Sequence, residues 1–288
     1  MQRSETVLKI RLKAISGSVS YVTLVLATAI ILYPLLWTFM MSLRTNQEIF
    51  ATPWGIPTNP VWENYMIAWE QGNLGISLEN SVVITFGSIV IMALICPMAA
   101  YALSKPIFGR KFLFYIFLVG MFMAPQVFII PLSMLLNQLG LIDTLLGLII
   151  VDGVGGIPYC IIIIRAAFLG LPACLEDSAK VDGLSTFQTF RKVLLPIVMP
   201  AVYTALIIEG IWVWNDFFYP LILTRSRGMF TLPLGIAIFR GGYMIQYGPL
   251  SAGTFIAMIP VIILYIVFAD LIRRGVAGAI AVKGAART

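Results

Sequence analysis

The residues that could do chemistry in this sequence are carboxylates, amides and aromatic rings, because its 288 residues include no histidine. Histidine-based metal sites and Ser–His or Cys–His catalytic pairs are therefore excluded. The three cysteines, Cys96, Cys160 and Cys174, fall within or beside apolar segments and share no motif spacing, so we interpret them as buried or interfacial thiols. We expect neither a metal site nor a catalytic residue in this chain.

A first group of candidates lies inside apolar stretches, where ionisable side chains are costly and indicate function. Rings that lie against the C–H faces of a sugar, beside groups that bond its hydroxyls, suit carbohydrate recognition. The alternatives are an aromatic belt at the outer interface for the run WVWNDFFYP, and helix packing beside glycines for the aspartate of VDGVGG. The candidate substrate-pathway residues are Asp152, Glu209, Trp212, Trp214, Asn215, Asp216 and Tyr219.

A second group lies in the polar segment 175–196, LEDSAKVDGLSTFQTFRKVLLP, which interrupts an otherwise hydrophobic chain. Residues 173–181 are compatible with a short helix, and Gly183 stands where a glycine commonly ends one. Ser185 followed three residues later by Gln188 predicts a capping box that begins a second helix. The segment therefore predicts a helix–turn–helix between two apolar stretches.

This helix pair has an acidic front, Glu176, Asp177 and Asp182, and an apolar stripe, Phe187, Phe190 and Leu194. It could lie flat on the membrane or form a docking element for a soluble partner. Interfacial helices usually present lysine and arginine, and three acidic residues would be repelled by an anionic leaflet. Docking is the favoured interpretation.

The elements that must position these residues are membrane helices. Only 11% of the residues are charged and the mean hydropathy is +0.95, which is unlike a soluble domain. Apolar runs of about 20 residues are long enough to cross a bilayer as helices. We predict an all-α polytopic membrane protein with six spans at about 18–43, 80–104, 112–137, 145–170, 198–222 and 251–272.

The basic residues give the direction of these spans. Lysine and arginine gather in 1–17, 105–111, 171–197 and 273–288, whereas loop 44–79 carries one arginine against four glutamates. Cytoplasmic loops carry the excess of lysine and arginine, so both termini are expected in the cytoplasm. Segment 223–250, with three arginines, departs from this trend. Topology accounts for the net charge of +6, and no nucleic-acid partner is needed.

Segment 175–196 resembles the cytoplasmic EAA loop of the permease subunits of bacterial ABC importers. Their motif E-A-A-x-x-x-G, followed by I-x-L-P, is matched here by D-S-A at 177–179, Gly183 and V-L-L-P at 193–196. The acidic position is Asp177, directly after Glu176, so either carboxylate could be the one that docks. The resemblance assigns ATPase coupling to Glu176, Asp177, Ser178, Ala179, Asp182, Gly183, Phe187, Phe190, Leu195 and Pro196.

Other segments in order along the chain, such as 33–50, 125–149, 161–172 and 214–223, also resemble these permeases, in particular the smaller membrane subunit of maltose-type transporters. The resemblance implies a type I importer fold and a heterodimer with a second homologous permease. It further implies two copies of a cytoplasmic ATPase, which hold ATP and Mg²⁺, and an extracytoplasmic solute-binding protein. The chain has no G-x-x-x-x-G-K-[ST] loop, so we expect no ATPase site of its own.

These expectations divide the chain into parts. Residues 1–17 and 273–288 are predicted cytoplasmic tails, and 18–272 the permease domain, with 44–79 an extracytoplasmic loop and 171–197 the coupling loop. Loop 44–79 is expected either to receive the binding protein or to cap the helices. The alternative function is a self-contained secondary transporter or channel, which usually has inverted repeats and ion-coupling residues. A membrane-embedded enzyme has no support in the residues.

Overall fold

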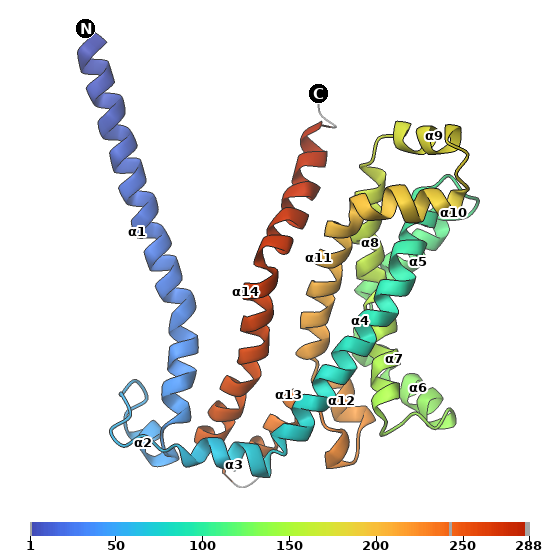
Figure 1. Ribbon diagram of the computed structural model, residues 1–288. Helices are drawn as coiled ribbons and strands as arrows, with labels where there is room; N and C mark the ends of the chain where they lie inside the picture. The colour runs from blue at the N-terminus through green and yellow to red at the C-terminus, as the bar shows by residue number, and fades with distance from the viewer. Residues whose placement is uncertain (1, 242–243, 286–288) are drawn as a thin grey trace. The chain divides into compact units, whose positions relative to one another are not determined.

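The structure, a computed structural model, describes the backbone of residues 2–241 and 244–285 and the side chains of 21–241 and 244–267 (Figure 1). Every regular element in this part of the chain is a helix, which confirms the predicted all-α class. Five helices are long and apolar enough to cross a membrane, and a bent helix pair brings the number to six if it counts as one span. By length and composition, the structure thus supports up to six spans.

The chain forms two compact units. One comprises residues 1–72 and 239–256, and the other comprises 73–238 and 257–288. The first contains α1 (Gln2–Ser42), α2 (Asn46–Ala51) and α3 (Glu63–Gln71). The helix α14 (Tyr247–Ala285) contributes residues to both units, because the boundary between residues 256 and 257 falls within it.

The first unit is organised around Arg44, whose side chain is 1% exposed. Its Nη2 donates to the carbonyls of Glu48 and Thr52, each at 2.7 Å. The amide of Asn64 donates to the carbonyls of Ser42 and Arg44, at 2.9 and 3.1 Å. A buried guanidinium needs several acceptors, and this loop supplies them. The single basic residue of loop 44–79 is therefore a structural centre of that loop.

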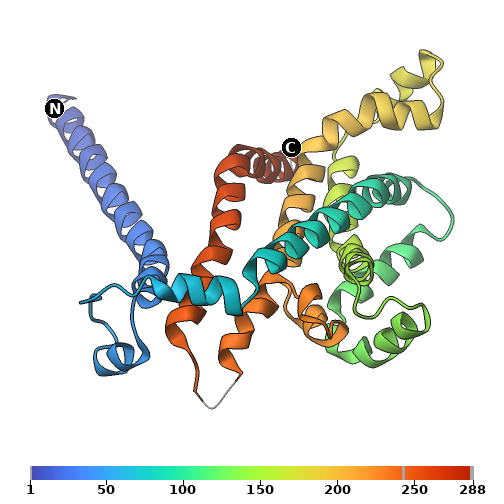
Figure 2. The same cartoon turned by 60° about the horizontal axis from the view of Figure 1, so that its bottom comes forward.

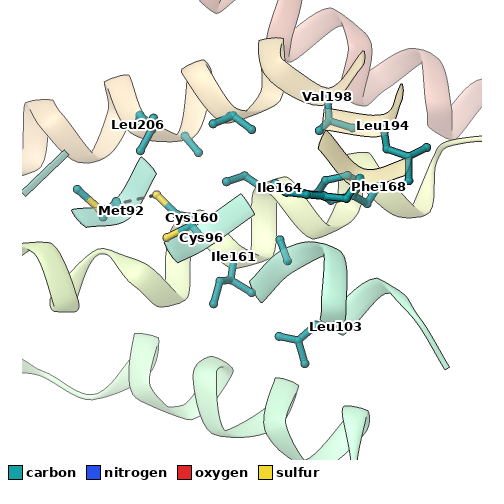
Figure 3. Close-up of a cluster of buried hydrophobic side chains, with 14 residues drawn as sticks. Met92, Cys96, Leu103, Cys160, Ile161, Ile164, Phe168, Leu194, Val198 and Leu206 are labelled. Atoms are coloured by element: carbon teal, nitrogen blue, oxygen red, sulfur yellow. Dashed lines mark hydrogen bonds between the residues drawn. The ribbon is translucent and has the colours of Figure 1, made fainter. Parts of the chain in front are cut away.

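The second unit is a bundle of α4 (Leu74–Ser104), α7 (Leu145–Gly155), α8 (Ile157–Leu169) and α11 (Leu195–Trp214). Figure 3 shows its main core, where α4 contributes Met92 and Cys96, α8 contributes Cys160 and Ile164, and α11 contributes Leu206. Cys96 and Cys160 are fully buried and Cys174 is exposed. The first two thiols thus pack as small apolar side chains, as predicted.

The third predicted span, 112–137, is formed by two helices. α5 (Arg110–Phe122) and α6 (Pro125–Gln138) meet at an angle of 100°. Pro125 begins α6, and Ala124 before it is extended, with ψ of 133°. A residue that precedes proline is disfavoured in the helical region, so the helix stops and restarts there.

The fifth span also differs from the predicted 198–222. α11 ends at Trp214, and the short α12 (Phe218–Leu223) follows a break. Asp216 lies in the break and accepts hydrogen bonds from the backbone N–H groups of Phe218 and Tyr219, at 3.0 and 3.2 Å. An aspartate side chain that satisfies the first amides of a helix favours a new start rather than continuation. After α12 come η2 (Arg227–Met229), α13 (Leu232–Ala237) and η3 (Ile238–Arg240).

The terminal helices extend beyond the predicted first and last spans. Helix α1 begins at Gln2, so most of the predicted tail 1–17 is helical and continuous with the first span. Helix α14 begins at Tyr247 and continues to Ala285. The side chains of both predicted tails, and residues 286–288 altogether, lie outside the described residues.

Candidate functional site

The centre of the site is α9 (Cys174–Val181), which lies with α10 (Thr186–Thr189) at one end of the second unit, while α6 and α12 lie at the other (Figures 1 and 2). The predicted glycine stop is confirmed. The N–H of Leu184 donates to the Ala179 carbonyl and that of Gly183 to the Lys180 carbonyl, both at 3.0 Å. This is a Schellman ending, which needs a left-handed residue, and Gly183 has φ of +74°.

The predicted capping box at the start of α10 is also confirmed. The N–H of Ser185 donates to Gln188 Oε1 at 2.9 Å, and the N–H of Gln188 donates to Ser185 Oγ at 3.3 Å. This helix is not separate from the fifth span, because it continues through the π-helical turn η1 (Phe190–Leu194) into α11. Pro196 has no N–H for the carbonyl of Lys192, and the widened turn absorbs this defect. The site is thus covalently continuous with a membrane helix.

The inner side of the site is anchored by apolar residues. Ala179 and Phe190 are 3% and 6% exposed. The Phe190 ring centroid lies 5.1 Å from that of Tyr101 on α4 and 6.1 Å from that of Phe168 on α8. Ring pairs at these separations add to the stability that burial gives. The predicted stripe is therefore only partly buried, because Phe187 is 57% exposed.

Glu176 and Asp177, two residues of the acidic front, form ion pairs with different lysines. Glu176 forms an ion pair with Lys105, which follows α4 directly, and both side chains are partly buried. Asp177 pairs instead with Lys180 of its own helix at 3.3 Å, and both are about 70% exposed. Burial, and then the positive charge of Lys180, lower the pKa of Lys105. The adjacent carboxylate of Glu176 opposes this effect and favours the charged ammonium.

Sequence reasoning did not find Lys105 or Tyr101. Both lie near the cytoplasmic end of the predicted second span, but the partner of Lys105 is 71 residues away along the chain. Such pairing has no short-range pattern. The signal available in the sequence was a lone lysine directly after a long apolar run.

The outer side of the site consists of exposed residues from α9, the turn and α10. Val181 is 87% exposed, whereas Leu175 and Ala179, the other aliphatic residues of α9, face the bundle core or are buried. Leu195 is half-buried and Pro196 exposed, further along the chain. We define the outer face as Asp177, Ser178, Val181, Asp182, Gly183 and Phe187.

Two candidate pathway residues are buried carboxylates within the bundle. Asp152 and Glu209 are 7% and 9% exposed, and neither has a hydrogen bond within the described residues. Gly156 makes room for Glu209, because a Cβ at this glycine would lie 2.8 Å from Glu209 Oε2. A carboxylate without a hydrogen bond inside a membrane bundle is expensive, so a role of these two residues in the substrate pathway stays a prediction.

The remaining pathway candidates do not form one cluster. Tyr219 packs against the apolar cluster that contains Val151, the neighbour of Asp152, and its N–H donates to Asp216 Oδ2 at 3.2 Å. Trp214 is buried, and its Nε1 donates to the Ala257 carbonyl at 3.4 Å, which is a packing role. Trp212 is 69% exposed, and Asn215 is exposed and donates to the Ile211 carbonyl at 2.7 Å. Asp152, Asp216 and Tyr219 are thus brought together, while the two tryptophans are not part of that group.

A family model described as "binding-protein-dependent transport system inner membrane component" matches residues 91–278, which contain the whole site. The chain belongs to this permease family. A probable ABC transporter permease protein of Bacillus subtilis, YurM, is 35% identical over 92% of this chain and 88% of its own length. The diacetylchitobiose uptake system permease protein NgcG of Streptomyces coelicolor is 30% identical over 92% and 87%.

A solved structure supports the same assignment of this permease. A chain of a bacterial ABC transporter involved in the import of the acidic polysaccharide alginate superposes with a TM-score of 0.73. It is 26% identical, and the match covers 89% of this permease and 96% of that chain. The predicted importer-permease fold is therefore confirmed. The breaks at Pro125 and Asp216 refine the boundaries of its elements.

Proposed function

We propose that this permease is one of two membrane subunits of an ATP-driven importer for a sugar or oligosaccharide. The relatives support the substrate class, since one belongs to a diacetylchitobiose uptake system and the superposed chain to an alginate importer. In this proposal a second, homologous permease supplies the other half of the pathway. An extracytoplasmic binding protein delivers the substrate, and loop 44–79 forms part of its receiving surface.

The observation that carries the proposal is the structure of the coupling loop, 171–197. A docking element must be rigid, must expose a recognisable surface and must be joined to a membrane helix. The Schellman ending and capping box fix α9 and α10, the outer face is exposed, and η1 continues into α11. In this proposal the outer face inserts into a cytoplasmic ATPase, two copies of which bind ATP and Mg²⁺.

This assignment gives Asp177 rather than Glu176 the docking role. The Asp177 carboxylate is exposed, and its only ion-pair partner among the described residues is Lys180, which is equally exposed. An exposed pair of this kind contributes about 0–1 kcal/mol, so a partner's cation can replace it readily. Glu176 is already held by Lys105. Both termini of the permease and the coupling loop lie in the cytoplasm in this proposal.

The direct test is to purify the importer through a tag on this permease and measure the ATPase that accompanies it. Charge reversal in Asp177→Arg should reduce the recovered ATPase by about tenfold, the effect of about 1.4 kcal/mol at an interface. Lys111→Glu is the matched control, because Lys111 is an exposed charge in another segment that is predicted to be cytoplasmic. The docking role is wrong if both variants retain the ATPase equally. The importer assignment is wrong if the unaltered permease recovers none.

A further inference from the structure

The ion pair between Lys105 and Glu176 joins the coupling loop to a helix that is remote in sequence. Lys105 directly follows α4 as its C-cap, and Glu176 lies in the first turn of α9. The side chains are 30% and 26% exposed. This contact lies on the inner side of the site and joins two elements. The Asp177–Lys180 pair, by contrast, is exposed and lies within one helix.

The surroundings of Lys105 indicate a fixed position. Its Nζ lies 4.9 Å from the centroid of the Tyr101 ring, a cation–π geometry. The Tyr101 ring in turn packs on Phe168 and Phe190, at centroid distances of 5.4 and 5.1 Å. A partly buried charge pair is screened less by salt than a surface pair. The ammonium is thus held between a carboxylate of α9 and an aromatic cluster that joins α4, α8 and η1.

Apart from this pair, α9 is held to the bundle by apolar contacts, since Leu175 packs against the main core. Ala179 is its one buried residue, and α9 is exposed along most of its outer side. The Glu176–Lys105 pair is the ion pair, within the described residues, that joins α9 to another helix. A force on the outer face would therefore reach α4 through this ion pair as well as through the Phe190–Tyr101 ring contact, and α11 through the peptide chain.

We propose that Lys105 is a positioning residue that ties the coupling helix α9 to α4, so that movement of the outer face is transmitted into α4 directly. This inference rests on the proposed docking of the outer face to an ATPase. It adds a charged route beside the continuous helix into α11 and the ring contact of Phe190 with Tyr101. It also gives Glu176 a role distinct from that of Asp177, namely transmission instead of docking.

Helix α4 is suited to carry such a movement across the bundle. Its 31 residues span about 45 Å at 1.5 Å per residue. It packs against α7, α8 and α11. Near its other end, Asn80 donates to the carbonyls of Gly228 and Phe230 at 2.8 and 3.0 Å, and Ser81 accepts from the N–H of Leu232 at 2.8 Å. Through these hydrogen bonds, a shift of α4 would displace the segment that contains η2 and the start of α13.

The test uses the assembled importer in nanodiscs, with Cys174→Ser to remove the exposed thiol and Ile76→Cys to place a label site at the far end of α4. Ile76 is 45% exposed, and the other two cysteines are fully buried. The measurement is the rate of labelling by a polar maleimide, without nucleotide and after trapping with ATP, Mg²⁺ and vanadate. ATPase recovery and ATP hydrolysis are measured on the same samples.

The nucleotide-dependent change in labelling should decrease about five-fold or more in Lys105→Met and Glu176→Gln, within the range of coupling between distant sites. The recovered ATPase should remain at the parental level in both. Lys111→Met is the matched control and should behave like the parent, because Lys111 is exposed and has no ion pair within the described residues. The exchanged pair Lys105→Glu with Glu176→Lys should restore the response.

Each other outcome has a definite meaning. An unchanged response in Lys105→Met, or an exchanged pair that assembles without restoring the response, would overturn the role of Lys105. If none of the charge-altered chains accumulates in the membrane, the pair is needed for folding and the transmission role is wrong. Loss of the ATPase from the parental importer would instead contradict the proposed function itself. The two failures are therefore distinguishable.

Discussion

At the scale of single residues, backbone conformation and close approach determine what the coupling loop and the bundle tolerate. Gly183 has φ of +74° and open space where a Cβ would lie, so its constraint is the backbone alone. A residue with a side chain in that conformation costs roughly 1–2 kcal/mol. We expect Gly183→Val to misdirect the chain from α9 into α10 and to reduce ATPase recovery several-fold, measured by co-purification.

The matched control for this change is Gly109→Val. Gly109 has φ of +77° and equally open space, and it is the N-cap of α5, outside the coupling loop. Both variants should lose similar stability, and only Gly183→Val should lose the ATPase. Equal loss of the ATPase in both would indicate general destabilisation and contradict the specific role of the turn.

Adjacent glycines in the bundle give a second prediction at this scale. A Cβ at Gly156 would lie 2.5 Å from Met92 Sδ and 2.8 Å from Glu209 Oε2, whereas a Cβ at Gly155 meets nothing within 4 Å. Both atoms belong to flexible side chains that can shift, so the cost should lie toward the lower end of the about 1–3 kcal/mol of overpacking. Gly156→Ala should therefore lower the melting temperature of the purified permease by several degrees, and Gly155→Ala should not. Equal melting temperatures would show that Met92 and Glu209 leave room for a methyl group at the α7–α8 junction.

At the scale of elements, the helix caps act through hydrogen bonds between near neighbours, so a change in a cap should affect only its own helix. Ser185→Ala removes the acceptor of the capping box, which is worth about 0.5–2 kcal/mol. Hydrogen exchange of the amides in Thr186–Thr189 should accelerate, while exchange in α9 should change little. Thr186→Ala, which alters a neighbouring hydroxyl outside the capping box, is the control. Unchanged exchange in Ser185→Ala would mean that η1 and α11 alone hold α10.

The sequence predicts those features of these elements that depend on interactions between residues close together along the chain. Gly183, Ser185 and Gln188 act on neighbours within five residues, so the helix pair and its caps were predicted correctly. The break at Pro125 also had a local cause, but hydropathy averaged over a whole span concealed it. The pairing of Lys105 with Glu176 depends on how α4 and α9 pack, and no local pattern contains that information. The same holds for the burial of Trp214 against α14.

At the scale of the whole molecule, polar contacts join separate segments of the second unit at both ends of its bundle. One end has the Lys105–Glu176 pair, and the other has Asp143 between α6 and α7. Asp143 Oδ1 accepts from the N–H groups of Arg225 and Ser226 at 2.8 and 2.9 Å, and Oδ2 accepts from the Ser226 hydroxyl. The coupling end is thus joined by an ion pair, and the far end by hydrogen bonds to a carboxylate.

These hydrogen bonds make the far end sensitive to acid. The hydroxyl of Ser226, followed by the two backbone N–H groups, lowers the pKa of Asp143 below its ordinary 3.8. A carboxyl group with a lowered pKa contributes stability that is present above its unfolded-state value and lost as the pH falls through the folded-state value. We expect the contact to be constant from neutral pH down to about pH 5 and to weaken below pH 3.8.

The measurement is hydrogen exchange of the Arg225 and Ser226 amides against pH, corrected for the intrinsic rates. Protection should decrease below pH 3.8 in the parent. Asp143→Asn should show weaker protection at neutral pH and no further acid-dependent loss, because its amide oxygen is neutral at every pH. Asparagine tolerates the left-handed conformation of this position, φ of 59°, so the comparison isolates the charge. Equal protection of these amides in both proteins at neutral pH would show that backbone packing, rather than the carboxylate, joins the α6–α7 connection to the segment after α12.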